Sequence, residues 1–321
     1  MRELLGRIPS AAAAALLICV AGCQAAGNGN AQADPTAAAK TAAAQAPSLL
    51  ELKNGTYRGF AEPRGSVVLT DGGWEGAPYV QDGAARPAVT FVRDFRLVGD
   101  VDGDGSEEAV VLLAQSSGGT GDMLHLAVVG RKDRAPYNIA TALVGDRVGV
   151  RGARVEGRRI VLDVVQAGER DALCCPGELV TRRWELSRGV LKEAPPEPRG
   201  RLTPDVMGGA DWVLRAWTAK DAAPPEPAVT LRFEGGRFAG HSGCNRYTAP
   251  VEAGKQPGDI ALGPVAGTRM MCPEPAMGVE MRFLRSLGGV RRFSFVAGQL
   301  ALSYELEGSV GAMYFERAAT R

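Results

Sequence analysis

Short apolar runs alternate with turn-forming residues over residues 48–194 of the chain. The runs cover residues 67–69, 89–91, 110–113, 124–129, 148–150, 160–165 and 183–186. Gly, Asp or Pro interrupts nearly every gap, and residues 156–159 and 187–189 have the composition of hairpin turns. The pattern predicts an antiparallel β domain, as a sandwich or a curled sheet, whose strand order it leaves open.

A second pattern follows a stretch at 192–205 that contains four prolines and several charges. We interpret residues 195–209 as a Pro-rich linker and residues 210–318 as a second domain. Two sets of apolar residues alternate as strands require, at Val229, Leu231 and Phe233 and at Leu300, Leu302 and Tyr304. Met277, Met281, Leu284 and Leu287 recur at helical spacing. The chain is therefore expected to be mainly β, with an α+β second domain in which one helix packs on a small sheet.

The N-terminus has the composition of an export signal. Arg2 and Arg7 flank the start of an apolar segment, residues 8–20, that is shorter than the about 20 residues a membrane span requires. Residues 20–23, Val-Ala-Gly-Cys, resemble the lipobox of bacterial lipoproteins. The resemblance implies that residues 1–22 are removed and that an acylated Cys23 holds the protein to a membrane of the cell envelope. An ordinary signal peptide with a chance cysteine is the alternative.

The residues after Cys23 further define location and charge. Gln24, in place of the Asp that retains such proteins at the inner membrane, implies an outer-membrane lipoprotein facing the periplasm if the cell is Gram-negative. Residues 23–47 contain little that could form a core, so they are expected to be a flexible tether. Removing residues 1–22 takes away two basic residues and one acidic residue, and the net charge of +1 becomes 0. A neutral chain without a basic cluster excludes a nucleic-acid partner.

An acidic turn, residues 99–108, separates two apolar runs of the first domain. Its oxygen-bearing residues occupy loop positions one, three, five, seven and nine, which are Asp100, Asp102, Asp104, Ser106 and Glu108. With Gly105 at position six, this is the beginning of a calcium loop. It is not an EF-hand, because position twelve is Val111 and the flanks are strand-like. It resembles the DxDxDGxxD loops of integrin-type proteins, and we predict a structural Ca²⁺. In the alternative, the carboxylates bond their own backbone and Arg93 or Arg96 balances their charge.

Two sequence blocks give the second domain a family resemblance. GCNRY at 243–247 and TRMMC at 268–272 occur in the order and spacing of the META domain of HslJ-like bacterial lipoproteins. The resemblance covers residues 210–318 and implies a role in stress tolerance or envelope maintenance. It also brings Cys244 near Cys272, so a disulfide between them is plausible. Cys174 and Cys175 are then left with each other, as a vicinal disulfide or as reduced thiols; bridges between the domains are the alternative.

Residues suited to catalysis are scarce. The chain has two histidines, His125 and His241, and the GHSGC at 240–244 is not a hydrolase elbow, because Cys replaces its last Gly and no histidine follows. Three acidic residues near the Cys174–Cys175 pair, Glu169, Asp171 and Glu178, have no spacing that indicates a glycosidase. Four methionines, Met270, Met271, Met277 and Met281, suggest core filling rather than copper binding, since paired histidines are absent.

These observations favour a non-enzymatic, lipid-anchored envelope protein that binds an unidentified envelope protein or ligand. The first alternative is a protein-interaction or inhibitor module that uses Asn245, Arg246 and Tyr247. The second is a calcium-dependent hydrolase with an unrecognised active site. For the three residues we also consider purely structural roles, in which Asn245 caps a turn, Arg246 pairs with Glu280 and Tyr247 packs in the sheet.

Overall fold

The computed structural model describes residues 45–60, 65–119 and 121–319. The predicted signal peptide, Cys23 and the tether up to residue 44 lie outside the described residues. Within those ranges, no helix has the length and apolar composition needed to cross a bilayer.

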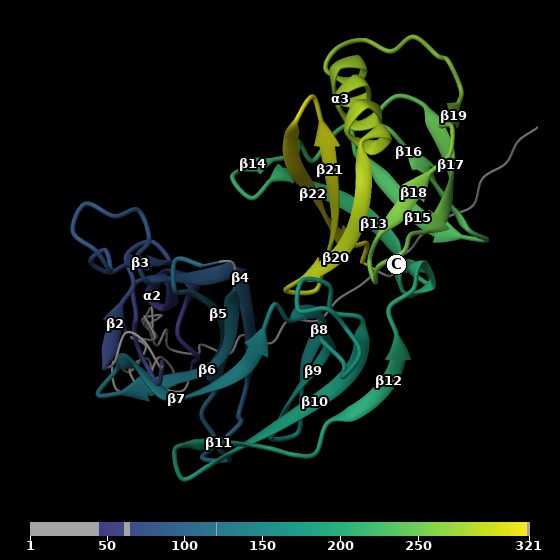
Figure 1. The fold of residues 1–321 in the computed structure, drawn as a ribbon. Helices are drawn as coiled ribbons and strands as arrows, with labels where there is room; N and C mark the ends of the chain where they lie inside the picture. Colours follow the sequence, from purple (N-terminus) through teal and green to yellow (C-terminus); the bar gives the residue numbers. More distant parts are fainter. Residues whose placement is uncertain (1–44, 61–64, 120, 320–321) are drawn as a thin grey trace, which may run out of the picture.

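Two five-stranded antiparallel sheets follow one another in the first domain (Figure 1). The first has the order β3-β4-β5-β6-β7, formed by β3 (Gly73–Glu75), β4 (Ala88–Gly99), β5 (Glu108–Ser116), β6 (Asp122–Lys132) and β7 (Ala135–Asp146). The second has the order β11-β10-β9-β8 with β12 also paired to β10, and consists of β8 (Gly149–Glu156), β9 (Arg159–Gln166), β10 (Glu178–Ser187), β11 (Val190–Glu193) and β12 (Glu197–Arg201). The predicted antiparallel β domain is confirmed.

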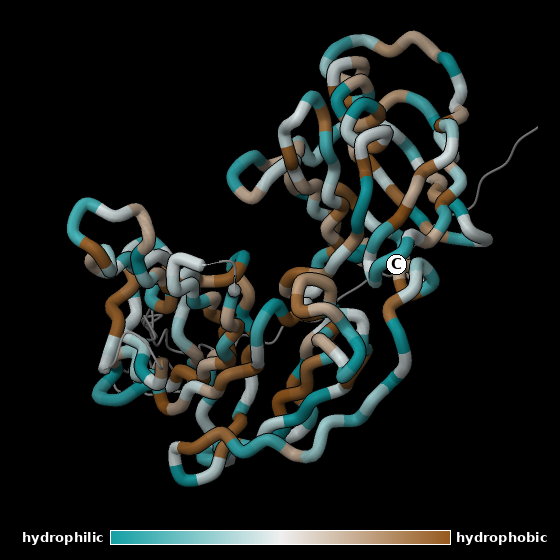
Figure 2. Tube along the Cα trace, viewed as in Figure 1, coloured by the Kyte–Doolittle hydropathy of each residue, from teal (hydrophilic) through white to brown (hydrophobic). Residues whose placement is uncertain are grey.

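The uninterrupted apolar run of β5 is explained by burial on both faces. Val110 and Leu112 pack against the core shared with β8, β9 and β10, whereas Val111 and Leu113 pack on the opposite side. That opposite side is covered by α2 (Leu49–Lys53), β1 (Thr56–Arg58) and β2 (Ser66–Val68). Successive side chains of a strand point to opposite faces, so a strand covered on both sides has no polar alternation. Figure 2 shows apolar stretches along the strands and hydrophilic residues in the connecting loops.

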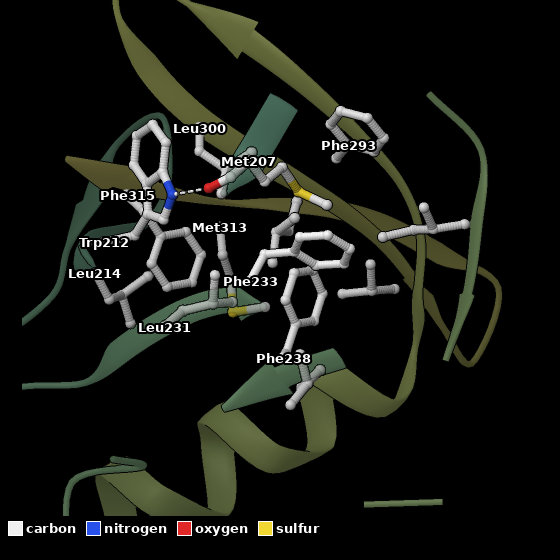
Figure 3. Close-up of a cluster of buried hydrophobic side chains, with 14 of the residues drawn as sticks. Met207, Trp212, Leu214, Leu231, Phe233, Phe238, Phe293, Leu300, Met313 and Phe315 are labelled. Atoms are coloured by element: carbon white, nitrogen blue, oxygen red, sulfur yellow. Dashed lines mark hydrogen bonds between the residues drawn. The ribbon is translucent and has the colours of Figure 1, made fainter. Parts of the chain in front are cut away.

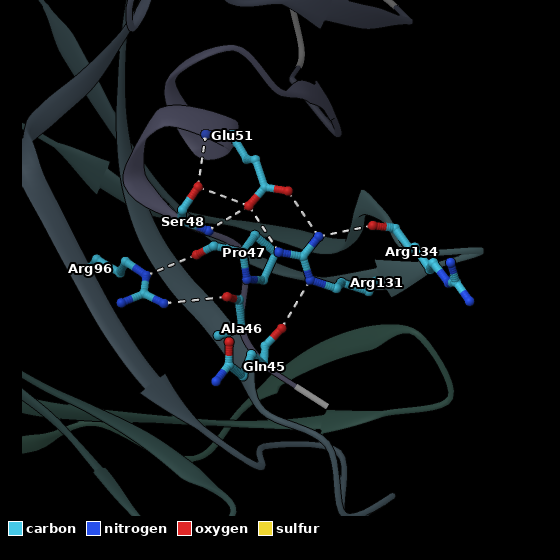
Figure 4. Close-up of polar contacts among 8 residues, drawn as sticks. All are labelled: Gln45, Ala46, Pro47, Ser48, Glu51, Arg96, Arg131 and Arg134. Atoms are coloured by element: carbon cyan, nitrogen blue, oxygen red, sulfur yellow. Dashed lines mark hydrogen bonds and ion pairs between the residues drawn. The ribbon is translucent and has the colours of Figure 1, made fainter. Parts of the chain in front are cut away.

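A polar cluster holds residues 45–51 against β4 and β6 (Figure 4). Ser48 and Glu51 form a capping box at the start of α2, and Arg131 of β6 binds Glu51 with both terminal nitrogens, at 2.8 and 2.9 Å. Arg96 donates to the Pro47 carbonyl at 2.9 Å. Ala46 and Pro47 are buried. The packed body therefore includes residues that the sequence pattern assigned to the tether.

The C-terminal domain is a curled antiparallel sheet with one long helix against it (Figure 1). The sheet follows β18-β17-β16-β15-β13-β22-β21-β20, and β18 also lies beside β20, so its two ends meet in a barrel-like arrangement. Its elements are η1 (Pro204–Met207), β13 (Asp211–Thr218), β14 (Asp221–Ala222), β15 (Thr230–Glu234), β16 (Arg237–His241), β17 (Arg246–Ala253), β18 (Ile260–Leu262), β19 (Ala266–Gly267), α3 (Ala276–Gly288), β20 (Val290–Val296), β21 (Gln299–Leu306) and β22 (Ser309–Arg317). The expected helix on a small sheet is confirmed.

Residues 195–209, predicted to be a linker, are structured instead. Among the described strands, β12 pairs with β10 alone and is an edge strand, where proline is tolerated. The turn η1 then places Met207 in the core of the C-terminal domain. The indole Nε1–H of Trp212 donates to the Met207 carbonyl at 2.9 Å (Figure 3). Proline content alone therefore does not distinguish an edge strand from a linker.

The prediction that the four methionines fill the core is wrong for Met270, Met271 and Met281, whose exposed fractions are 60, 94 and 64%. The buried apolar side of α3 consists of Val279, Phe283 and Leu287. Val279 and Phe283 follow Met277 and Met281 by two positions each, so the two methionines lie on a different side of the helix. Met270 and Met271 precede the helix and project from the connecting segment. Three thioethers are thus available at the surface.

The two domains share a small apolar seam. Val165 and Leu179 of the first domain join the core of the second. The β8 and β20 backbones approach closely at Gly149, where an added Cβ would lie 3.0 Å from the Phe295 carbonyl oxygen. The Gly298 N–H donates to the Val150 carbonyl at 2.9 Å. The second domain is therefore packed against the first through β8, β9 and β10.

Candidate functional site

A groove of about 690 Å³ lies in the C-terminal domain between α3 and the edge formed by β17 and β19. These elements stand at the end of that domain remote from the β-rich domain (Figure 1). Both sequence blocks that carry the family resemblance contribute to it. The lining residues are Ser242, Asn245, Arg246, Tyr247, Val265, Ala266, Gly267, Thr268, Arg269, Met270, Met271, Met277, Glu280 and Leu284.

Asn245 connects the two blocks beneath the groove. Its Oδ1 accepts from the Thr268 hydroxyl at 2.8 Å and from the Met270 N–H at 2.7 Å. Its Nδ2 donates to the Met270 carbonyl and to Glu280 Oε1, both at 3.0 Å. A side-chain amide that forms hydrogen bonds through both its oxygen and its nitrogen holds each of its bonding partners in a defined position. Asn245 is therefore a buried framework residue.

Glu280 of α3 completes this framework. Its Oε2 accepts from the Asn245 N–H at 2.7 Å and from the Ser242 hydroxyl, while the side chain is only 8% exposed. Burial raises the pKa of Glu280, but the hydrogen bonds from Ser242 and Asn245 outweigh that effect and leave the pKa below its ordinary value. The Glu280 carboxylate is therefore charged at neutral pH, and both of its oxygens accept hydrogen bonds from the turn before β17.

A disulfide and a glycine hold the same turn against the rest of the domain. Cys244 and Cys272 are bonded, with a Cα–Cα distance of 5.9 Å, which confirms the expected bridge. Gly243 has a φ of +107°, and a Cβ there would lie 2.9 Å from Val279 Cγ1 of α3. Only glycine meets both conditions without strain. The turn is thus attached to the 268–272 segment by a covalent bond and to α3 by close approach.

The three predicted binding residues have different roles. Tyr247 is buried, stacks edge to face on Phe283 and donates its hydroxyl to the Thr230 carbonyl at 3.0 Å. Burial raises the pKa of Tyr247. Asn245 belongs to the framework. Arg246 does not pair with Glu280, and its side chain is exposed, so of the three it alone offers a charged group to a ligand.

The groove also contains residues that the sequence did not single out as binding residues. Arg269 is exposed, and among the described residues its guanidinium and that of Arg246 have no hydrogen-bonding or acidic partner. Val265 is partly exposed beside β19. The position of Arg269 within the TRMMC block was the available signal. The exposed surface therefore combines two unpaired arginines with methionine and valine side chains.

The acidic loop of the first domain brings some of its predicted ligands together. One carboxylate oxygen each from Asp100, Asp102 and Glu108 lies within 4.8 Å of the others. Asp104 lies outside this group and accepts from the Ser106 N–H at 2.7 Å. Asp100 accepts from the Gly103 N–H at 2.6 Å. Oxygens at this spacing fit one ion that binds its ligands at 2.3–2.6 Å.

The charges around this loop differ from the expected compensation. Arg96 binds the Pro47 carbonyl and Arg93 binds Gln299, so neither reaches the carboxylates. Arg158 lies against the loop instead and donates to the Asp102 carbonyl. Glu108 is buried and accepts from the Val101 N–H at 3.0 Å. Burial, together with the charges of neighbouring aspartates, raises the pKa of Glu108 to about 7.

The residues considered for catalysis are occupied elsewhere. His125 is buried with Nε2 2.7 Å from Gln115 Oε1, and burial lowers its pKa to about 4. His241 Nδ1 accepts from the Gly243 N–H at 3.2 Å, and the neighbouring Cys244 is disulfide-bonded. Asp171 accepts from Arg201 and from the Gly168 and Gly177 N–H groups.

Cys174 and Cys175 are free thiols, the first exposed and the second buried. Arg292 of the second domain donates to Cys175 Sγ at 3.6 Å. A hydrogen bond with Cys175 raises the pKa of Cys174. Neither the vicinal disulfide nor a bridge between the domains is present in this structure.

The comparisons with known proteins concern the C-terminal domain for the family match. The C-terminal domain consists of a curled antiparallel sheet, one helix against it and a disulfide-linked turn. Residues 205–318 match the META domain family, so the C-terminal part of the chain is a META domain. No curated protein matches the chain. An NMR structure of the protein from Burkholderia xenovorans is similar at 24% identity, covers 37% of this chain and 90% of its own, and has a TM-score of 0.29.

Proposed function

We propose that the protein is a lipid-anchored cell-envelope protein whose META domain binds a partner through the groove and performs no catalysis. The observation that carries the proposal is that the polar residues of the groove fall into two groups, one that holds the turn in place and one that is exposed. Asn245 and Glu280 are committed to holding the turn, whereas Arg246 and Arg269 are exposed and unpaired among the described residues. Such a rigid frame with unsatisfied charges at its rim suits recognition. A META domain is consistent with a role in envelope stress tolerance.

The non-enzymatic part of the proposal rests on where the reactive groups lie. Cys244 is bonded to Cys272 and so cannot act as a thiol nucleophile with His241. His125 is buried between strands, out of reach of a substrate. Asp171 is engaged by Arg201 and two backbone N–H groups, which hold its pKa at about 2. A general base or acid requires access and a suitable pKa, and these groups lack one or both.

We further propose that Asp100, Asp102 and Glu108 hold a structural Ca²⁺. The three converging oxygens suit the ion, and Ca²⁺ would offset the unfavourable ionisation of a buried Glu108. It would tie the end of β4 to the start of β5. The loop is separate from the groove in sequence and domain, so its role in the proposal is stability.

The anchor is tested by labelling cells with a radioactive or alkynyl fatty acid and separating their envelopes. The wild-type chain is expected to carry label and to sediment with the envelope fraction, whereas Cys23→Ala is expected to carry none. Cys174→Ser is the matched control, because it removes an exposed thiol and leaves Cys23 intact. Equal labelling of the wild type and Cys23→Ala would contradict the lipoprotein part of the proposal.

A further inference from the structure

We propose that the META groove binds an extended polypeptide segment that carries apolar side chains and carboxylates, and that this segment pairs with the free edge of β19. The inference rests on the proposed binding function and names its partner class. It draws on three features of the groove: its unmatched positive charge, an open strand edge and its exposed methionines.

The charge of the groove selects an anionic partner. Five other arginines of the same domain are paired with acids, namely Arg215–Glu316, Arg232–Asp211, Arg282–Asp221, Arg285–Glu307 and Arg292–Asp259, whereas Arg237, Arg291 and Arg317, all outside the groove, have no acidic partner among the described residues. Arg246 and Arg269 have no such partner in the described part of the chain. Glu280 is the one carboxylate among the groove-lining residues, and it is consumed by Ser242 and Asn245. Two guanidiniums repel a metal cation at the nearby thioethers and favour bidentate binding of carboxylates.

The edge of β19 provides directional hydrogen bonds. Among the described residues this strand pairs with β17, and no strand lies on its other side. The Thr268 N–H donates to the Arg246 carbonyl at 3.1 Å. Because pairing groups alternate along an antiparallel strand, the N–H and C=O of Gly267 point away from β17. An extended peptide satisfies such groups by adding a strand, whereas a lipid chain has no groups that pair with them.

The methionines suit the side chains of such a segment. Met270 and Met271 are 60 and 94% exposed, and Leu284 and Val265 also line the groove. An unbranched thioether adapts to apolar groups of different shapes, so methionine is frequent at surfaces that accept varied peptides. The groove therefore combines adaptable apolar contacts with two fixed charges. This combination favours a peptide of alternating apolar and acidic residues, whose alternate side chains face opposite sides.

The test uses the full chain with Cys23→Ala and a fluorescein-labelled nine-residue peptide that alternates leucine with glutamate. Fluorescence anisotropy is expected to show saturable binding that is at least tenfold tighter than for the same peptide with lysine in place of glutamate. The double variant Arg246→Glu/Arg269→Glu is expected to weaken binding of the acidic peptide at least tenfold. Arg237→Glu, an exposed charge reversal on β16 outside the groove, is expected to leave it unchanged.

A second probe separates strand addition from simple charge attraction. The same leucine–glutamate peptide, N-methylated at alternate residues on its pairing edge, is expected to bind at least fivefold more weakly, because those N–H groups can no longer pair. Phosphatidylglycerol vesicles provide the lipid comparison. Equal binding of the acidic and lysine peptides, unchanged binding by Arg246→Glu/Arg269→Glu, or arginine-dependent binding of vesicles without peptide binding would each overturn the inference. Fatty-acid labelling at Cys23 does not depend on these results, so the two proposals fail separately.

Discussion

Two polar clusters in this protein use arginine and glutamate in opposite ways. At the start of the first domain, Arg131 is matched to Glu51 (Figure 4). Beneath the META groove, Glu280 is buried but receives neutral donors from Ser242 and Asn245. The nearby arginines, Arg246 and Arg269, are left without partners among the described residues. In the first cluster the charges of Arg131 and Glu51 balance each other, whereas the second leaves two arginines without a partner among the described residues, and we propose that these bind a ligand.

The largest effect is expected from removing the disulfide that gives the groove its shape. Cys244→Ser/Cys272→Ser should lower the free energy of unfolding of the META domain by about 3–4 kcal/mol, because the bridge closes a loop with a sequence separation of 28. Denaturant unfolding measures the change, with Cys174→Ser as the control. A loss no larger than that of the control would mean that the turn is held without the bridge.

A somewhat smaller loss is expected for Glu280→Gln. The amide nitrogen of Gln would face a hydrogen-bond donor of Ser242 or Asn245, leaving buried groups unpaired at a cost of about 2–3 kcal/mol. Glu252→Gln, at an exposed position on β17, is the matched control and should be neutral. If Glu280→Gln were equally neutral, the framework role of the carboxylate would have to be abandoned.

The Arg131–Glu51 ion pair of the first domain should make the free energy of unfolding depend on pH under acidic conditions. The Arg131 guanidinium hydrogen-bonds Glu51 and holds its pKa at about 2, below the ordinary 4.5. A depressed pKa in the folded state gives stability that is present above pH 4.5 and lost as the pH falls toward 2. Because Glu51 is 35% exposed, solvent screening reduces the contribution to about 1 kcal/mol.

Glu51→Gln should therefore destabilise the protein at pH 7 by about 1 kcal/mol and flatten its unfolding free energy between pH 4.5 and 2. Chemical unfolding at a series of pH values measures this. An acid profile identical to the wild type would show that the pair contributes nothing.

The acidic loop is the opposite of the groove in charge: it gathers carboxylates, whereas the groove has arginines without acidic partners among the described residues. If Ca²⁺ binds the native state with a Kd of 10⁻⁴ to 10⁻³ M, 1 mM Ca²⁺ should add about 0.4–1.4 kcal/mol. Asp102→Ala should abolish the increase and EDTA should reverse it, as followed by the melting temperature. A wild-type melting curve that does not respond to Ca²⁺ would leave the loop as an Asx-type turn.

The sequence predicted elements whose pattern follows directly from local physics. The antiparallel strands and the α3 helix are present. The Cys244–Cys272 bridge is also present, but it was implied by the META resemblance and not by local pattern. The sequence prediction failed for the core role of Met270, Met271 and Met281 and for the 195–209 linker. In each case tertiary context decides: the buried apolar side of α3 is set by what it packs on, and proline is tolerated in β12 because that strand lies at an edge.

The site was predicted only in part for a similar reason. The GCNRY and TRMMC blocks indicated the region of the site. The sequence does not show, however, which of their polar side chains form hydrogen bonds within the domain. Asn245 and Tyr247 turn out to be bonded within the domain, and Arg246 is free of Glu280. Arg269 is identified as a candidate by the structure alone, which places it in the same groove as Arg246 and gives it no partner among the described residues.

The most direct test of this account compares stability and peptide binding in the same variants. Arg246→Ala/Arg269→Ala is expected to leave the free energy of unfolding within about 0.5 kcal/mol of the wild type while weakening the acidic leucine–glutamate peptide at least tenfold. Arg131→Ala is expected to do the reverse, destabilising the fold without changing peptide affinity. If the groove variant lost stability and kept its affinity, its arginines would be structural and the central distinction between the two clusters would be wrong.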